Sequence, residues 1–172
     1  MESGFKVRVF NNRTDYEKVL RLISDIVVNE FEFKLDFDGL DSDISCIEEH
    51  YKKFDGGCFW VAESIKNCDN NKDNNKNRQI VGTTALRNLK EFESTAELKR
   101  MYVLRQFRQL GIGQKMLDIA IGFARSFGYK RIVLDSSKYL YAARHLYLKK
   151  GFVDISRYNN NNRADVFMEK KL

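Results

Sequence analysis

A basic segment followed by two glycines stands where the chain could bind an anion. Arg105 and Arg108 precede Gly111 and Gly113, and an apolar pattern of helical period begins directly after them. A helix N-terminus presents free backbone N–H groups and a partial positive charge, and glycine lets a phosphate approach those groups closely. The segment therefore predicts a site for the phosphate or pyrophosphate of a cofactor.

Two other interpretations of this segment compete with that one. In the first, the glycines serve only a turn. In the second, Gly111 and Gly113 belong to a dinucleotide site, and Asp135 would bind the ribose at the end of the next strand. Against the second, the third glycine position of that fingerprint holds Met116. No Gly-Lys-Ser/Thr triplet follows either, so a P-loop is not indicated.

The elements that must position this segment follow from the period of the apolar residues. We expect strands at residues 5–10, 58–63, 79–86, 96–103, 131–135, 152–157 and 165–168, and helices at about 14–27, 44–54, 112–127 and 139–150. The strand–helix–strand unit around 112–127 implies a parallel pair, and the hairpins imply antiparallel neighbours. The fold class is therefore α/β, with one mixed sheet flanked by about four helices in a single domain over residues 5–172.

The composition of the chain limits the classes of protein to which it can belong. The 172 residues carry a net charge of +6, which favours anionic partners, but the basic residues are spread along the chain. We expect no nucleic-acid partner, no membrane partner or signal peptide, and a cytoplasmic or nuclear protein that is a monomer or homodimer. The three cysteines and two histidines show no metal-ligand spacing, so we expect no metal. Residues 66–78 contain six Asn and are expected to form a flexible loop within the domain.

Four motifs occur together, in an order and spacing that resemble the GNAT superfamily of N-acetyltransferases. They are Glu97-Leu98-Lys99-Arg100-Met101-Tyr102-Val103, Arg108-x-x-Gly111-x-Gly113, Ile132-Val133-Leu134-Asp135 and Ala142-Ala143-Arg144-His145-Leu146-Tyr147-Leu148-Lys149-Lys150-Gly151-Phe152. The resemblance covers most of residues 5–170 and is most specific from 96 to 152. It implies that the strand at 97–103 splays from its parallel neighbour at 131–136, and that acetyl-CoA lies in the gap.

The same resemblance implies the residues that contact acetyl-CoA. Backbone groups of Met101, Tyr102 and Val103 would pair with its pantetheine arm. The pyrophosphate would be wrapped by Arg108, Gln109, Gly111, Ile112, Gly113 and Gln114. The chain departs from the family where Leu140 or Tyr141 replaces a common Asn early in the last helix, which puts that cofactor contact in doubt.

The chemistry of acetyl transfer to an amine needs a base and an acid. By the resemblance, Glu97 would act as the general base, directly or through a water. Tyr147, four residues before Gly151, would act as the general acid toward the leaving thiolate. The alternatives are a non-catalytic acyl-CoA-binding regulatory protein, and a nucleic-acid-binding module.

The acceptor is expected to be a primary amine of a small molecule or of a peptide or protein. The acidic stretch from Glu30 to Asp43 could attract a cationic amine or be simply a solvated loop. Arg87 follows a predicted strand and could bind a carboxylate of the acceptor.

Overall fold

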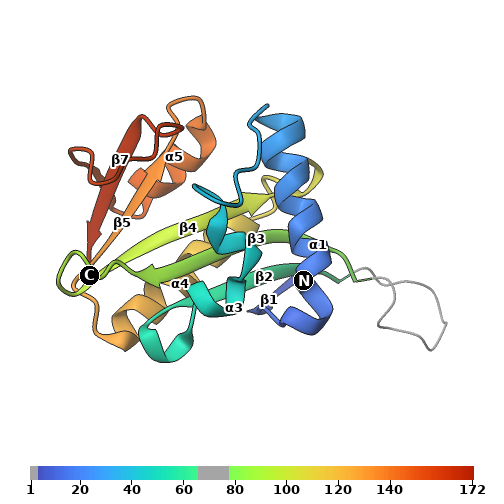
Figure 1. Cartoon of the computed structure of the whole chain (residues 1–172), viewed down its shortest axis with the longest axis horizontal. Coiled ribbons are helices and arrows are strands. Elements are labelled where there is room, and N and C mark those ends of the chain that lie inside the picture. The colour runs from blue at the N-terminus through green and yellow to red at the C-terminus, as the bar shows by residue number, and fades with distance from the viewer. Residues whose placement is uncertain (1–3, 66–77) are drawn as a thin grey trace.

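The computed structural model describes residues 4–65 and 78–172 (Figure 1). Its strands are β1 (Phe5–Val9), β2 (Cys58–Ser64), β3 (Ile80–Asn88), β4 (Thr95–Val103), β5 (Arg131–Ser136), β6 (Val153–Asp154) and β7 (Val166–Lys171). Its helices are α1 (Asn12–Ser24), the π-helix η1 (Asp25–Glu30), α2 (Ser42–Ser45), α3 (Ile47–His50), the 3-10 helices η2 (Lys53–Asp55) and η3 (Arg105–Phe107), α4 (Ile112–Phe127) and α5 (Tyr141–Lys149). The expectation for the Asn-rich segment 66–78 lies, apart from Arg78, outside the described residues.

The strands form one mixed sheet in the order β1-β2-β3-β4-β5-β7-β6. β4 and β5 are parallel, and the other neighbouring pairs are antiparallel. α4 makes the crossover that joins the parallel strands, as such a connection requires. The predicted α/β fold with a mixed sheet is confirmed, although the strand expected at 152–157 is reduced to the two residues of β6.

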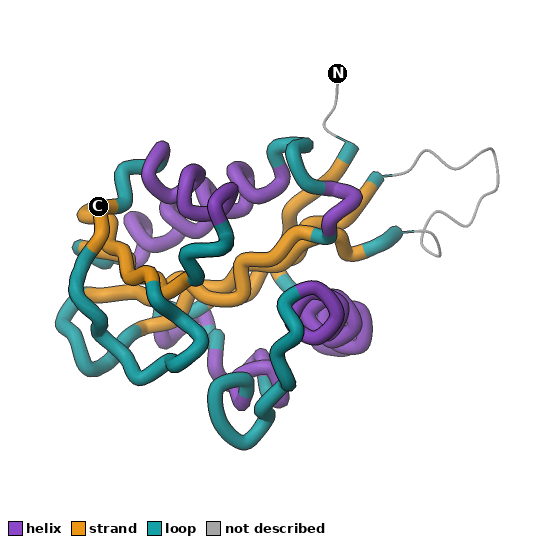
Figure 2. Tube along the Cα trace, turned by 90° about the horizontal axis from the view of Figure 1, so that it is seen from above, coloured by secondary structure: helices purple, strands orange, loops and turns teal. Residues whose placement is uncertain are grey.

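Helices cover both faces of the sheet (Figure 2). α4 buries an apolar stripe that includes Leu117 and Ala120 against one face, and α5 adds Tyr147 to the same cluster. α1 packs on the opposite face through Val19 and Ile23. Each helix is amphipathic because its apolar residues recur every three or four positions. Within residues 4–65 and 78–172, no helix has the length and hydropathy needed to cross a bilayer.

The segment between α1 and β2 departs most from expectation. The single helix predicted over 44–54 is replaced by α2, α3 and η2. The N-cap of α1 is Asn11, which accepts a hydrogen bond from the Arg13 amide at 3.1 Å. The carboxylate of Asp15, in the first turn of α1, is bound by the guanidinium of Arg8 in β1, at 2.6 and 2.9 Å.

β4 and β5 pair over only part of their length. The register begins with Thr95 opposite Arg131 and ends with Leu98 opposite Leu134. Beyond those residues β4 continues to Val103 while β5 turns away from it (Figure 1). We call this divergence the fork. The splayed parallel pair expected from the sequence is present, and it leaves backbone groups of both strands without a strand partner on the fork side among the described residues.

Candidate active site

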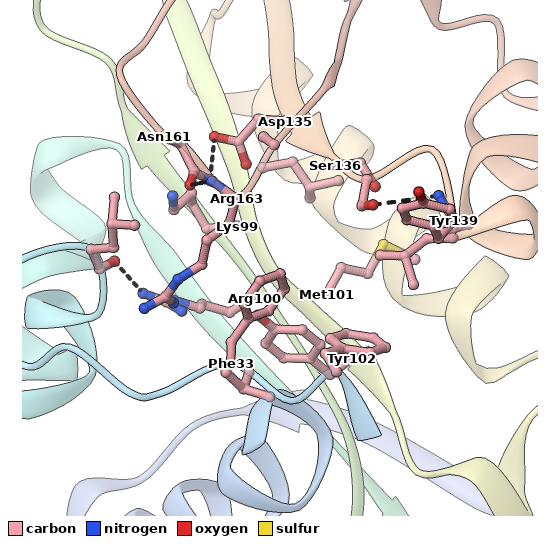
Figure 3. Close-up of a pocket in the computed structure, with 18 of the residues that line it drawn as sticks. Phe33, Lys99, Arg100, Met101, Tyr102, Asp135, Ser136, Tyr139, Asn161 and Arg163 are labelled. Carbon is pink, nitrogen blue, oxygen red and sulfur yellow. Dashed lines mark hydrogen bonds between the residues drawn. The ribbon is translucent and has the colours of Figure 1, made fainter. Parts of the chain in front are cut away.

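A pocket of about 400 Å³ opens at the fork (Figure 3). Its volume lies within the roughly 300–1,000 Å³ of small-molecule sites. One wall comes from η1 and the loop that follows, and it combines four apolar side chains, Val27, Phe31, Phe33 and Leu40, with the acidic Glu30 and Asp41. The other side carries most of the polar groups, from β4, β5, α5 and the loop before β7: Lys99, Arg100, Met101, Tyr102, Asp135, Tyr147, Asn161 and Arg163.

β4 is bulged beside this pocket. In the register with β3, Lys99 faces Ala85 and Tyr102 faces Thr83, so two residues of β4 lie opposite one residue of β3. Arg100 takes a left-handed conformation with φ of 54°, and its carbonyl accepts the Thr83 hydroxyl at 2.8 Å. Because a bulge redirects side chains, Arg100 can reach the α2 side of the sheet.

Arg100 is the centre of a buried network of ion pairs. Its guanidinium donates to Asp41 at 2.8 Å and to both carboxylate oxygens of Asp43. Arg163 binds the second oxygen of Asp41 at 2.8 Å, and the Tyr51 hydroxyl donates to Asp43. Burial raises the pKa of Asp43, but the hydrogen bonds and charge of Arg100 more than offset it, so that the pKa is lowered overall. The acidic stretch is thus partly an internal counter-charge to arginine.

The loop before α4 has the backbone geometry of an anion cradle. Gln109 and Gly111 both have positive φ, 65° and 80°, which turns the chain sharply into the helix. No described side chain caps the N-terminus of α4. The first-turn amides of Ile112, Gly113 and Gln114 are therefore without a side-chain acceptor, and such donors favour a negative ligand.

Gly113 brings this cradle to the fork. A Cβ built at Gly113 would lie 3.6 Å from Met101 Cε and Leu146 Cδ2, and 3.9 Å from Val103 Cγ2. These are ordinary van der Waals distances, and the φ of Gly113 is not positive. Neither packing nor backbone conformation requires glycine at position 113. The space that a Cβ of this residue would fill is therefore open to a ligand.

Arg108 already has an anionic partner within the chain. It forms two hydrogen bonds to the carboxylate of Glu30, at 2.5 and 2.8 Å, and its Nε donates to the Val103 carbonyl at 3.0 Å. Both side chains are partly exposed, 38% for Arg108 and 29% for Glu30. An anion that bound Arg108 would therefore compete with the carboxylate of Glu30.

Tyr147 lies at the inner end of the pocket. It is 5% exposed, and its hydroxyl is 3.6 Å from the sulfur of Met101. Burial, followed by the charges of Tyr102 and Asp135, raises its pKa above the usual value. The phenol keeps its proton at neutral pH, as an ordinary phenol also does.

Glu97 lies on the paired part of β4 and does not line the pocket. It is 1% exposed, and Arg87 binds its Oε2 at 2.6 and 2.7 Å. Tyr158 donates its hydroxyl to Oε1 at 3.0 Å. Asn159 Nδ2 donates hydrogen bonds to Glu97 Oε1 at 3.5 Å and to Asp135 Oδ2 at 2.6 Å. The side chain of Arg87, considered above for the acceptor, binds Glu97.

A model of the Acetyltransferase (GNAT) family matches residues 23–152, well over half of the sequence. The chain belongs to this family. A GNAT-family acetyltransferase structure from Staphylococcus aureus Mu50 has a TM-score of 0.81 and 28% identity, covering 97% of this chain and 98% of that one. An acetyltransferase structure from Salmonella typhimurium with its cofactor acetyl-CoA has a TM-score of 0.71, covering 98% and 94%, and at 18% identity supports the fold alone.

Curated relatives match between about two thirds and three quarters of the chain. The chain is 32% identical over 136 residues to the "Probable N-acetyltransferase camello" of Xenopus laevis, covering 76% of this chain and 57% of the relative. It is 35% identical over 113 residues to the N-acetylaspartate synthetase of Homo sapiens, covering 66% and 33%. The chain thus spans between a third and just over half of the length of these relatives.

The structure of this GNAT chain brings most of the predicted residues together. Met101, Tyr102 and Tyr147 line the pocket, and Gly113 lies beside Met101 and Val103. Glu97 is not among the lining residues. The sequence did not single out Lys99 or Arg163. The alternation of β4 would have placed Lys99 on the face opposite Leu98, but only the fork shows that this face opens onto a pocket.

Proposed function

We propose that this chain transfers an acetyl group from acetyl-CoA to a primary amine. The proposal rests on one observation. The uncapped N-terminus of α4 lies beside the fork, where Gly113 is next to Met101 and Val103. Family membership and the acetyltransferase names of the relatives support the same activity. Acetyl-CoA, when bound, supplies the acetyl group as a thioester.

The residues present fit this cosubstrate in two ways. Backbone N–H and C=O groups that face the fork need hydrogen-bond partners, and an amide-containing arm would provide them along Met101, Tyr102 and Val103. The amides at the start of α4, from Gly111 to Gln114 with Ile112 and Gly113 between them, would receive the pyrophosphate. Gln109 would shape that turn, and Arg108 would add a cation once Glu30 releases it.

Two side chains would handle protons. Tyr147 would donate its proton to the thiolate, since it is protonated at neutral pH and lies at the fork. Glu97 would take the proton of the amine through a water or through the Tyr158 hydroxyl, because it is not itself a lining residue. The network that holds Glu97 would fix that path.

A thermal-shift measurement tests the binding step first. Acetyl-CoA at about 100 times its Kd should stabilise the fold by roughly 2.7 kcal/mol, which is roughly 5–11 °C in Tm for a domain of this size. NADH at the same excess should leave the Tm unchanged. A shift with NADH alone would refute the proposal and return Gly111, Gly113 and Asp135 to a dinucleotide site.

Release of free thiol from acetyl-CoA tests catalysis. Glu97→Gln and Tyr147→Phe should each lower kcat by about 10²–10⁴-fold, the usual contribution of a general base or acid, while the thermal shift with acetyl-CoA is retained. The alternative, a non-catalytic acyl-CoA-binding regulatory protein, predicts the same thermal shift with no thiol release from the unmodified chain.

A further inference from the structure

The charges around the pocket nearly all have partners within the chain. Arg100 is bound by Asp41 and Asp43, and Arg163 is bound by Asp41. Glu30 at the rim is bound by Arg108. Two charged side chains of the lining remain, Lys99 and Asp135.

Lys99 and Asp135 are neighbours across the fork. They follow Leu98 and Leu134, the last residues that β4 and β5 hold in register. Both leucines point into the cluster beneath α4, so strand alternation turns Lys99 and Asp135 to the other face, toward the pocket. Figure 3 shows both side chains among those that line it.

These opposite charges do not neutralise each other. No ion pair joins them. Lys99 forms no hydrogen bond or ion pair with any residue in 4–65 or 78–172, and its charge acts only at longer range on Asp43, whose carboxylate Arg100 already binds. Asp135 uses one oxygen to accept from Asn159 at 2.6 Å and Asn161 at 3.3 Å. Its other oxygen accepts from no described residue. Both side chains are half-buried, so a ligand between them would be partly shielded from water.

The fork therefore presents a cation and a carboxylate on one face of the sheet, beside the gap in which we propose that the thioester of acetyl-CoA lies. A ligand that matches both must carry an anionic and a cationic group a short distance apart. Asp135, Lys99 and Tyr147, the proposed acid, line the same pocket. The sign of the charges sets the orientation of the ligand, because an ammonium group pairs with the carboxylate and a carboxylate with the lysine. An ammonium group at Asp135 would thus stand beside the reacting atoms, with the carboxylate of the same molecule at Lys99.

We propose that the acceptor is an α-amino acid with an apolar side chain, its ammonium group held by Asp135 and its carboxylate by Lys99. This inference rests on the proposed acetyl transfer and names the acceptor for it. The apolar side chains of the η1 wall, Val27, Phe31, Phe33 and Leu40, would receive the side chain of the amino acid. Lys99 and Asp135 are then specificity-determining residues of the reaction.

The test measures thiol release with L-leucine, L-phenylalanine and L-methionine, each against its α-amide, which keeps the amine and lacks the carboxylate. A charged hydrogen bond is worth roughly 1.5–3 kcal/mol, so kcat/KM for the amino acid should exceed that for its amide by roughly 10–150-fold. Lys99→Met should remove this preference by lowering the rate with the amino acid more than the rate with its amide. Asp135→Asn should lower both rates at least tenfold, because both acceptors carry the ammonium group.

The controls separate this inference from the proposed function. Lys130→Met, at an exposed lysine outside the lining, should change neither rate. Equal rates for acids and amides, an equal loss of both in Lys99→Met, or no turnover of any of the three amino acids by a chain that binds acetyl-CoA would each overturn the inference alone. Failure to bind acetyl-CoA would overturn the proposed function itself.

Discussion

Replacing Gly113 by Ala should raise stability and weaken acetyl-CoA binding at once. Alanine is favoured over glycine in a helix by roughly 0.5–1 kcal/mol. The added methyl would meet nothing closer than 3.6 Å, so no clash offsets that gain. At roughly 2–4 °C per kcal/mol for a domain of this size, the Tm should rise by about 1–4 °C.

The same methyl would project toward Met101 and Val103, where the cofactor is expected to pass. Loss of hydrogen bonds from the first-turn amides to a charged phosphate costs roughly 1.5–3 kcal/mol, so Kd should rise by roughly 10–150-fold. Isothermal titration calorimetry with acetyl-CoA measures this change directly. A rise in Tm together with a decrease in affinity cannot come from general damage to the fold.

Gly122→Ala is the matched control. Gly122 lies in the same helix, is exposed, and a Cβ there would have no atom within 4 Å. It should show a similar gain in Tm with an unchanged Kd. If Gly113→Ala bound acetyl-CoA as tightly as Gly122→Ala does, the cradle would not include Gly113, and the reasoning from the open space would be refuted.

Three further predictions concern ion pairs. Glu30→Gln should tighten acetyl-CoA binding at most about fivefold, since a partly exposed pair is worth about 0.2–1 kcal/mol; calorimetry showing weaker binding would contradict competition for Arg108. Arg100→Met should lower the free energy of unfolding by about 3–5 kcal/mol in urea, because it leaves buried carboxylates uncompensated; a loss below about 1 kcal/mol would show the network to be dispensable. Because the folded pKa values of Asp41 and Asp43 lie below the unfolded value of 3.8, their stabilisation is present above that pH and is lost as pH falls below it. Urea midpoints should therefore drop below about pH 4, and Arg100→Met should show a smaller drop.

The turn before α4 and most of the strands were readable from sequence because their signals are local. Gly111, Gly113 and the apolar stripe of α4 lie within a few residues of one another, and the strand patterns repeat every second residue. The parallel pair followed from the helix between its two strands. Even the splaying of that pair was implied by the family resemblance.

The charge pairing was not readable, because its partners are far apart in sequence. Arg100 meets Asp43 across 57 positions, and Arg108 meets Glu30 across 78. A bulge at Arg100 shifts which residues face the pocket, and strand alternation alone does not reveal it. Glu97 was identified as a candidate base from its place in a motif, whereas its burial under Arg87 and Tyr158 depends on packing between three separate segments.

The short overlap of β4 and β5 also bears on how the fold opens. Within residues 4–65 and 78–172, β4 and β5 pair only over Thr95–Leu98 and Arg131–Leu134, and this short ladder joins the β1–β4 part of the sheet to the β5–β7–β6 part. Such a narrow seam suits sub-global opening, in which one part of a domain exchanges its amide hydrogens before the whole unfolds. A ligand that bridges the fork would lock both parts into one cooperative unit. Acetyl-CoA should then slow amide exchange along β5 and β7, well beyond the residues it touches.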